Sequence, residues 1–335
     1  MESTPSASGN TAELMEQILY EVKRVVVGQD RFLERVMVAM LAQGHLLVEG
    51  VPGLAKTLTV KTLANTVRGN FKRIQFTPDL VPADLVGTRI YNQKTGEFAT
   101  SLGPVFTNLL LADEINRAPA KVQSALLEVM QERQVTIAGE THKMPSPFLV
   151  MATQNPIETE GTYPLPEAQV DRFMMKVLVD YPTDEEEFVI VQRVTGAAVS
   201  VTAVASTEQL AQLQHACRQV YVDPSLIQYA VRLVSATRTP EKHDLKDLRR
   251  FITYGCSPRA SINLTEAARA LAMLRGRTYV LPEDMSDLVP DVFRHRLVLS
   301  YEALSEGLTP DAVIGKIMAR IAAPAKPLEH EKLAA

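Results

Sequence analysis

The sequence has little cysteine, no tryptophan and no long apolar run. Its two cysteines, Cys217 and Cys256, lack the spacing of a metal site, so free thiols in a reducing compartment are expected. The longest clean apolar run, VMVAMLA at residues 36–42, is far shorter than the roughly 20 residues that a membrane span needs. The first residues, MESTPSASGN, lack the basic and apolar regions of a signal peptide. These absences predict a cytoplasmic protein without a membrane span.

An excess of basic residues is also missing. The 335 residues carry a net charge of −4, and the pI is about 5.9. Nucleic acid is therefore not the expected partner, although a local basic patch could hide in that average. The six histidines are scattered along the chain, which argues against a metal site built by protein side chains alone.

The apolar pattern changes near residue 180, which predicts two domains. Residues 1–11 are small and polar and predict a flexible N-terminal tail. Residues 12–180 contain short, continuous apolar runs separated by helical patterns, which is typical of a parallel sheet covered by helices on both faces. Residues 181–335 begin with a capping-box pattern at Thr183 and Glu186 and then show helical periodicity, so we expect a helical second domain.

Individual segments predict particular elements. We expect helices at residues 11–26, 58–67, 119–132, 208–220, 224–237, 261–274 and 311–321, with one more ending near residue 42. Buried strands are expected at residues 45–48, 71–76, 108–114 and 147–155. Two hairpins are expected at residues 89–100 and 135–144.

The stretch EGVPGLAKT, residues 49–57, lies between a predicted strand and a predicted helix. It approaches the phosphate-loop pattern G-x-x-x-x-G-K-[ST], in which backbone amides cradle phosphates, the lysine reaches the β- and γ-phosphates and the hydroxyl binds Mg²⁺. Alanine replaces the second glycine, and a methyl group there is tolerated if φ is negative. The alternative is a helix-initiating turn with an incidental lysine. The candidate nucleotide-binding residues are Gly50, Val51, Pro52, Gly53, Leu54, Ala55, Lys56 and Thr57.

The stretch LLLADE places Asp113 and Glu114 at the end of a buried strand. In α/β proteins, ligands bind at the carboxyl ends of the strands. Asp113 would hold Mg²⁺, directly or through water, and Glu114 would orient the attacking water. Two solvated acids at a turn are the alternative, and the phosphate-loop candidate upstream makes it less favoured.

Other polar residues become functional candidates only because these two motifs are present. Asn155 follows a buried strand in MATQNP and would emerge at the same sheet edge as Asp113, although a turn asparagine is the simpler reading. An arginine that neutralises transition-state charge accelerates nucleotide hydrolysis greatly. Arg117, Arg172 and Arg259 are candidates, and a surface salt bridge is the alternative for each of them.

Taken in order, VVVGQD, GVPGLAKT, LLLADEINRAP, MATQNP, LPEAQVDRF and GCSPRA resemble the MoxR family of AAA+ ATPases over residues 12–325. The resemblance implies an AAA+ αβα parallel-sheet core with two hairpin inserts, followed by a C-terminal all-helical lid. In this family the loop usually reads with alanine at the position of Ala55. ATP and Mg²⁺ are the implied cofactors, and ATP hydrolysis to ADP and phosphate is the implied reaction.

The resemblance also implies a role for single residues. Asn155 matches the sensor-one residue, and Arg172 matches the arginine finger that acts on a neighbouring subunit's nucleotide. Arg259 matches the sensor-two arginine, and Val27 and Gly28 match the segment that contacts adenine. A finger acting on a neighbour requires a homo-oligomeric ring, usually a hexamer.

MoxR-like proteins typically act as chaperone-like remodellers with a partner that carries a von Willebrand factor A domain, and they assist maturation or cofactor insertion of client proteins. A nucleic-acid motor or transcription regulator is the alternative, and salt-sensitive nucleic-acid binding would discriminate it. A nucleotide-gated scaffold that hardly hydrolyses is a further alternative, disfavoured by Glu114. In the first hairpin, Tyr91, Lys94 and Phe98 are equally consistent with client contact and with packing against a neighbour.

Overall fold

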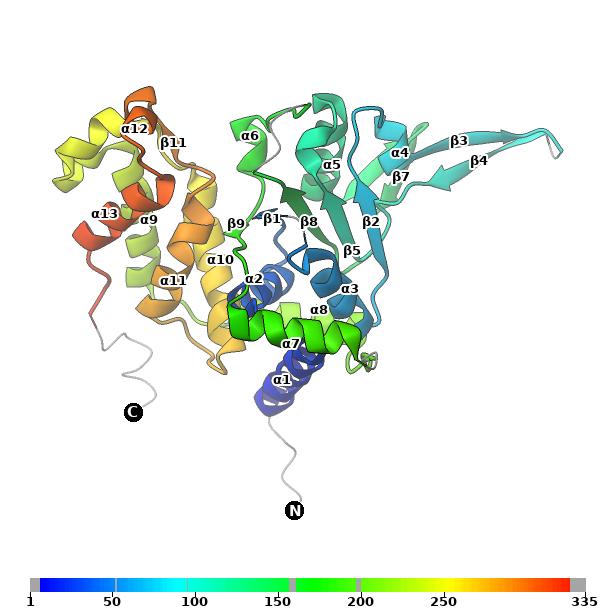
Figure 1. Ribbon diagram of the computed structural model, residues 1–335, viewed down its shortest axis with the longest axis horizontal. Coiled ribbons are helices and arrows are strands. Elements are labelled where there is room, and N and C mark those ends of the chain that lie inside the picture. Colours follow the sequence, from blue (N-terminus) through cyan, green and yellow to red (C-terminus); the bar gives the residue numbers. More distant parts are fainter. Residues whose placement is uncertain (1–6, 52, 95, 157–160, 197–199, 326–335) are drawn as a thin grey trace, which may run out of the picture. The chain divides into compact units, whose positions relative to one another are not determined.

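The computed structural model describes residues 7–51, 53–94, 96–156, 161–196 and 200–325. Its central element is a five-stranded sheet with the strand order β2–β5–β8–β1–β9 (Figure 1). The strands are β1 (Leu46–Glu49), β2 (Phe71–Gln75), β5 (Leu109–Asp113), β8 (Leu149–Gln154) and β9 (Met175–Leu178). The pairs β2–β5, β5–β8 and β1–β8 are parallel, as the continuous apolar runs predicted.

The central strands of the sheet are more buried than its edge strand β2. Strands β5 and β8 are buried along almost their whole length and turn half-exposed only at their carboxyl ends. Strand β2 is an edge strand with mostly exposed side chains. The four expected strands are confirmed, whereas β9 was not predicted, because its sequence MKVL is too short and too mixed to stand out.

The helices before residue 200 are α1 (Ala7–Val25), α2 (Asp30–Leu41), α3 (Lys56–Thr66), α4 (Pro82–Val86), α5 (Ala120–Glu132), α6 (Glu167–Val170) and α7 (Asp184–Thr195). Helix α3 packs against β2, β5 and α1. Helix α1 begins at Ala7, so residues 7–11 of the expected tail are helical. Serine, glycine and asparagine in this stretch are weak helix formers, which explains why the pattern predicted a later start. The capping box that precedes α7 is confirmed at Thr183 and Glu186.

Both predicted hairpins are confirmed. The first joins β3 (Gly87–Asn92) to β4 (Glu97–Leu102), and Figure 1 shows it extending away from the five-stranded sheet. The second joins β6 (Gln134–Ile137) to β7 (Glu140–Lys143). On the first hairpin, Tyr91 pairs across the strands with Phe98, their ring centroids lie 5.0 Å apart, and both side chains are exposed.

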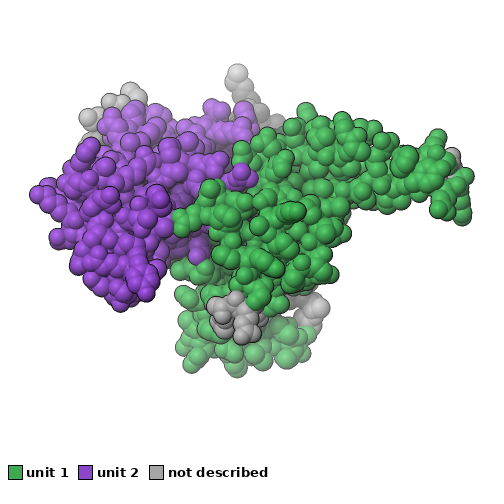
Figure 2. Space-filling model, turned by 90° about the horizontal axis from the view of Figure 1, so that it is seen from above, with its two compact units in different colours: residues 1–36, 45–169, 177–213 green, residues 37–44, 170–176, 214–335 purple. Residues whose placement is uncertain are grey.

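The chain forms two compact units, coloured in Figure 2. Unit 1 comprises residues 1–36, 45–169 and 177–213, and unit 2 comprises residues 37–44, 170–176 and 214–335. The division is therefore not a single cut in the sequence, and a domain boundary near residue 180 stays a prediction. No helix in the described residues is long and apolar enough to span a membrane.

The C-terminal half is dominated by helices. They are α8 (Thr207–Arg218), α9 (Pro224–Arg238), α10 (Pro258–Leu274), α11 (Pro282–Phe293), α12 (Tyr301–Ser305) and α13 (Pro310–Arg320), with the 3-10 turns η2 (Pro240–His243) and η3 (Lys246–Phe251). The predicted helices in this half are confirmed, and α11 and α12 add to them. A small antiparallel sheet of β10 (Ile252–Tyr254) and β11 (Val298–Leu299) was not predicted, because strands of two or three residues leave no periodic pattern.

Candidate active site

The loop between β1 and α3 has backbone features that suit phosphate binding. A Cβ atom at Gly50 would lie 2.5 Å from the carbonyl oxygen of Val179, so this position requires glycine. Gly53 has a φ of +88°, in the left-handed region that favours glycine. The loop leads directly into the first turn of α3, whose unpaired backbone N–H groups and helix dipole favour an anion. Val51 is half-buried, and Pro52 lies outside the described residues.

Ala55 corrects one expectation about this loop. A methyl group is tolerated here if φ is negative, but the φ of Ala55 is +53° and its ψ is 15°, in the left-handed region, so this condition is not met. A Cβ in this region costs about 1–2 kcal/mol. The loop therefore keeps the backbone shape that the glycine of the common motif supplies, and it does so with a strained residue. Strained backbone of this kind clusters at functional sites.

Lys56 is the first residue of α3, and its Nζ donates a hydrogen bond to the carbonyl oxygen of Gly50 at 2.5 Å. Burial lowers the pKa of Lys56, and the negative charges of Asp113, Glu114 and Glu49 partly oppose this effect. The ammonium group therefore lies in a half-buried position within the field of several carboxylates. A phosphate group bound in the loop would add further negative charge near the Lys56 ammonium.

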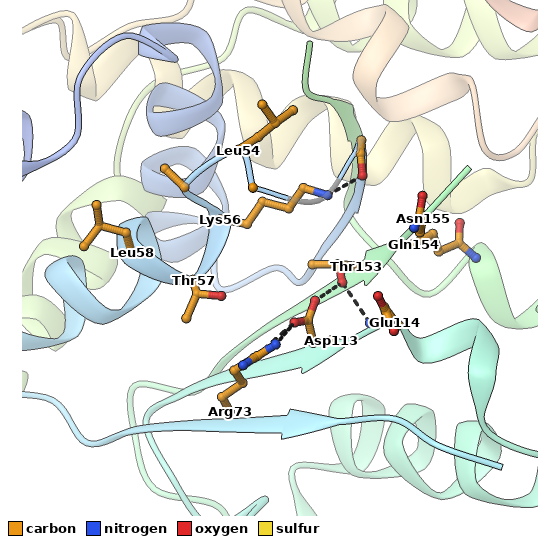
Figure 3. A pocket seen from close by; sticks show the side chains of 13 residues that line it. Leu54, Lys56, Thr57, Leu58, Arg73, Asp113, Glu114, Thr153, Gln154 and Asn155 are labelled. Atoms are coloured by element: carbon orange, nitrogen blue, oxygen red, sulfur yellow. Dashed lines mark hydrogen bonds and ion pairs between the residues drawn. The ribbon is translucent and has the colours of Figure 1, made fainter. Parts of the chain in front are cut away.

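Asp113 ends β5, and Glu114 follows it at a φ of +55°, in the left-handed region. Thr153 on β8 connects the two residues (Figure 3). Its hydroxyl donates to Asp113 Oδ1, and its Oγ1 accepts the backbone N–H of Glu114 at 2.9 Å. A buried side chain of the neighbouring strand therefore holds both acidic residues in place.

Two side chains of the edge strand β2 reach the same carboxylates. Arg73 Nε donates to Asp113 Oδ2 at 3.0 Å, and its Nη2 donates to Gln75 Oε1 at 2.8 Å. Gln75 Nε2 donates to Glu114 Oε2 at 2.7 Å, and Arg117 Nε lies 2.9 Å from the same oxygen. The carboxylate of Glu114 is thus restrained from two sides.

The loop and the two acids line one cavity of about 380 Å³. It brings together nine residues singled out from the sequence: the loop residues Gly50, Gly53, Leu54, Ala55, Lys56 and Thr57, with Asp113, Glu114 and Asn155. Asn155 lines the cavity and is buried, with 8% of its surface exposed. Arg73, Thr153 and Gln154 also line the cavity, and Figure 3 shows Asp113 and Glu114 at the carboxyl end of β5 beside Thr153.

A second, smaller cavity of about 90 Å³ adjoins the loop and has a mainly apolar lining, to which Gln29 and Arg193 contribute polar side chains. Val25, Val27, Ile190 and Val194 line it, together with Gly53, Leu54, Ala55 and Leu58 of the loop and α3. Because these last four residues line both cavities, a ligand with a phosphate end and a flat apolar end fits the pair. Gly28 beside Val27 has a φ of +65°, and a Cβ there would lie 2.7 Å from the side chain of Glu186.

The donor atoms of the larger cavity suit a magnesium ion. Thr57 offers a hydroxyl and Asp113 a carboxylate, which are hard oxygen ligands. Mg²⁺ commonly binds through one or two protein oxygens together with phosphate and water, so a denser cluster of ligands is not needed. Within the described residues, no group of three or more His, Cys, Asp or Glu side chains is arranged to hold a metal ion.

Arg172 and Arg259 both belong to unit 2 and are described there. Arg172 lies just after α6 and is half-buried. Arg259 lies in the first turn of α10, and its Nη1 is 3.5 Å from Asp171 Oδ2.

Sequence patterns alone missed Thr153, Gln75 and Arg73. Thr153 lies two residues before Asn155 in MATQNP, still inside the predicted buried strand, where a threonine gives no sign of a polar role. Gln75 reaches Glu114 because β2 pairs with β5 in a register that sets Gln75 opposite Asp113. Only the order of the strands in the sheet contains that information.

Comparison with known proteins agrees with this geometry. Residues 45–175 match the ATPase family associated with various cellular activities (AAA), and residues 245–317 match the AAA lid domain. The chain is 55% identical to Chaperone MoxR1 of Mycobacterium tuberculosis, covering 95% of this chain and 85% of that protein. It is 33% identical to Protein MoxR of Paracoccus denitrificans, covering 90% and 94%.

A solved structure from Cytophaga hutchinsonii is also similar. It superimposes with a TM-score of 0.90 at 47% identity, covering 95% of this chain and 97% of that one. The five-stranded parallel sheet, the helical C-terminal half and the relatives named MoxR agree with one another. The chain belongs to the MoxR family of AAA+ ATPases.

Proposed function

We propose that this protein binds Mg²⁺ and ATP and hydrolyses ATP to ADP and phosphate. The observation that carries the proposal is that one cavity is lined both by loop residues 50 and 53–57 and by Asp113 and Glu114. A phosphate-binding loop and a pair of acids at the carboxyl edge of a parallel sheet are the two parts that nucleotide hydrolysis requires.

Binding rests on the loop and on Lys56. The amides at the start of α3 and the ammonium of Lys56 hold the β- and γ-phosphates, because both present positive charge to the same side of the cavity. The apolar cavity beside Val27 accepts the adenine ring, with Gly28 in the adjoining turn. Thr57 and Asp113 would hold Mg²⁺, which supplies charge neutralisation on the phosphate oxygens when bound.

Glu114 orients the attacking water in this proposal. Its carboxylate is held by Gln75 and Arg117, and its backbone N–H is fixed by Thr153. A base that is held at several points keeps its geometry when substrate binds, which is what general base catalysis requires. Asn155, at the end of the adjoining strand, hydrogen-bonds the water or the γ-phosphate without competing for the metal.

The arginines complete the site in an assembly. Arg172 acts as a finger on the nucleotide of a neighbouring subunit, and Arg259 contacts the γ-phosphate as sensor two. Both roles come from the family resemblance. The finger role of Arg172 requires a homo-oligomeric ring, for which a hexamer is the expected size. Positive charge brought to the γ-phosphate stabilises the charge that spreads over its oxygens during transfer.

We further propose that ATP hydrolysis drives a chaperone-like remodelling of client proteins during maturation or cofactor insertion. The similarity to a protein named Chaperone MoxR1 supports the chaperone role. A partner with a von Willebrand factor A domain is expected from the family resemblance, and a cytoplasmic location is expected from the composition. The exposed Tyr91 and Phe98 on the first hairpin offer a client-contacting surface.

Glu114→Gln tests the hydrolytic part of the proposal. The amide keeps the size of the side chain but cannot accept a proton, so ATP binding should remain while turnover falls by a factor of about 100 or more. Nucleotide binding is measured by equilibrium titration and turnover by phosphate release. Glu128→Gln, at an exposed position of α5, serves as the control. Retained turnover in Glu114→Gln would remove Glu114 from its role as base.

A further inference from the structure

The carboxylate of Asp171, the residue before Arg172, is shared by three side chains of unit 2. Arg296 Nε donates to Asp171 Oδ1 at 2.8 Å. The Ser257 hydroxyl lies 2.9 Å from each carboxylate oxygen, and Arg259 Nη1 lies 3.5 Å from Oδ2. The residue beside one functional arginine is therefore in contact with the other.

The segment that carries Arg172 is bound firmly to the end of α11. Three consecutive residues, Arg294, His295 and Arg296, hydrogen-bond to backbone carbonyls of residues 171–176. Arg296 is fully buried and contacts three of these carbonyls as well as the Asp171 carboxylate. A buried arginine with this many partners fixes the backbone path on both sides of Arg172.

Ser257 joins this segment to the start of α10. It is the N-cap of the helix, and its Oγ accepts the backbone N–H of Arg259 at 3.2 Å. The same hydroxyl donates to Asp171. One side chain thus connects the backbone of Arg259 to the residue that precedes Arg172.

The two arginine partners of Asp171 differ in how readily a competing anion can displace them. The side chain of Arg296 is fully buried, whereas that of Arg259 is 44% exposed and its contact is the longest of the three. An exposed pair at this distance is worth little, so a phosphate oxygen can take Arg259 away from Asp171. The buried pair with Arg296 would remain.

We propose that Asp171 is a positioning residue that couples the two arginines. It fixes the segment of Arg172 through Arg296 and Ser257, and it holds Arg259 in a contact for which the γ-phosphate competes. Capture of Arg259 by ATP then removes one ion-pair partner from Asp171, the residue next to the finger. The inference rests on the proposed roles of Arg172 and Arg259.

Asp171→Asn gives a signature that simple structural damage does not. The amide competes less well for Arg259, so the affinity for ATP relative to ADP should rise about two- to fivefold, the size expected for loss of a half-exposed ion pair. Turnover should fall about tenfold or more, because Arg172 loses its positioning. In an Arg259→Ala background, Asp171→Asn should leave the ATP-to-ADP affinity ratio unchanged.

Ser257→Ala is a second variant that leaves the charge pair with Arg296 intact. Turnover should fall about tenfold with ATP affinity unchanged within about twofold. Ser257→Thr retains the hydroxyl and should restore turnover. Thr309→Ala, which removes the N-cap of α13 in the same unit without touching Asp171, is the matched control for a lost cap.

The measurements are ATP and ADP titrations and steady-state phosphate release on the full chain, with thermal unfolding to check the fold. If Arg259→Ala does not weaken ATP relative to ADP, the proposed role of Arg259 fails and the inference fails with it. If Arg259→Ala does weaken ATP but Asp171→Asn weakens it too, or if Ser257→Ala turns over like Thr309→Ala, the coupling alone is overturned.

Discussion

Replacing Thr153 with valine removes one hydroxyl from the centre of the candidate site. Thr153 is 2% exposed, and valine has nearly the same shape, so the packing around it should persist. What disappears is the hydroxyl that donates to Asp113 and accepts from the backbone N–H of Glu114. The variant therefore tests whether this hydrogen-bonded connection positions the two acids.

The expected loss of stability follows from those two bonds. Leaving the Glu114 N–H without its acceptor costs about 1–3 kcal/mol, and losing a donor to a carboxylate costs a similar amount. The cost of the lost donor to Asp113 is reduced, because this carboxylate keeps its contact with Arg73 and is partly exposed. We expect the free energy of unfolding to fall by about 2–4 kcal/mol. Turnover should fall about tenfold or more, because Glu114 loses a fixed backbone position.

Thr66→Val is the matched control. Thr66 is also buried, and its hydroxyl bonds only the carbonyl of Thr62 one turn earlier in α3, so its loss should cost less than about 1 kcal/mol. Urea unfolding followed by circular dichroism measures stability, and phosphate release measures turnover. If Thr153→Val matches Thr66→Val in both measurements, the hydroxyl does not hold the acids and the reasoning is refuted.

Three more predictions address single features. Ala55→Gly should raise the free energy of unfolding by about 0.5–1 kcal/mol, because relief of left-handed strain exceeds the added entropy of the unfolded chain. Ala120→Gly, at a helical φ, should lower the free energy of unfolding, and urea unfolding of both variants tests this difference. Arg172→Ala should abolish turnover alone, and mixing it with Lys56→Ala subunits should restore part of it; no rescue at any ratio argues against a finger acting across subunits. Burial lowers the pKa of His45 from 6.5 to about 4, so the unfolded chain takes up the proton first as the pH falls, and stability should drop by up to about 3 kcal/mol between pH 6.5 and 4. His45→Gln should flatten this part of the profile in urea titrations, and an unchanged slope would assign it to other groups.

Much of the fold could be predicted because its signals are local. The buried strands appear as continuous apolar runs, and the hairpins appear as turn residues between short alternating segments. The capping box at Thr183 and Glu186 marks the start of α7 within four residues of sequence. Short elements such as β9 and β10 gave no such signal, because tertiary pairing stabilises them.

The candidate site divides in the same way. Lys56, Asp113, Glu114 and Asn155 could be singled out because each follows a recognisable strand or loop. The contact of Gln75 with Glu114 could not, because it depends on which strand lies beside β5.

The sequence by itself determined the chemistry that is available: a loop ending in Lys-Thr, two adjacent acids, an asparagine and candidate arginines in a fixed order. Tertiary structure decided how those groups are held. It brought Thr153 and Gln75 onto the acids, set Ala55 in the left-handed region and joined Asp171 to Ser257, Arg259 and Arg296. The physical reason is that parallel strand pairing and buried ion pairs connect residues far apart in sequence, and no local pattern records the register or packing that brings them together.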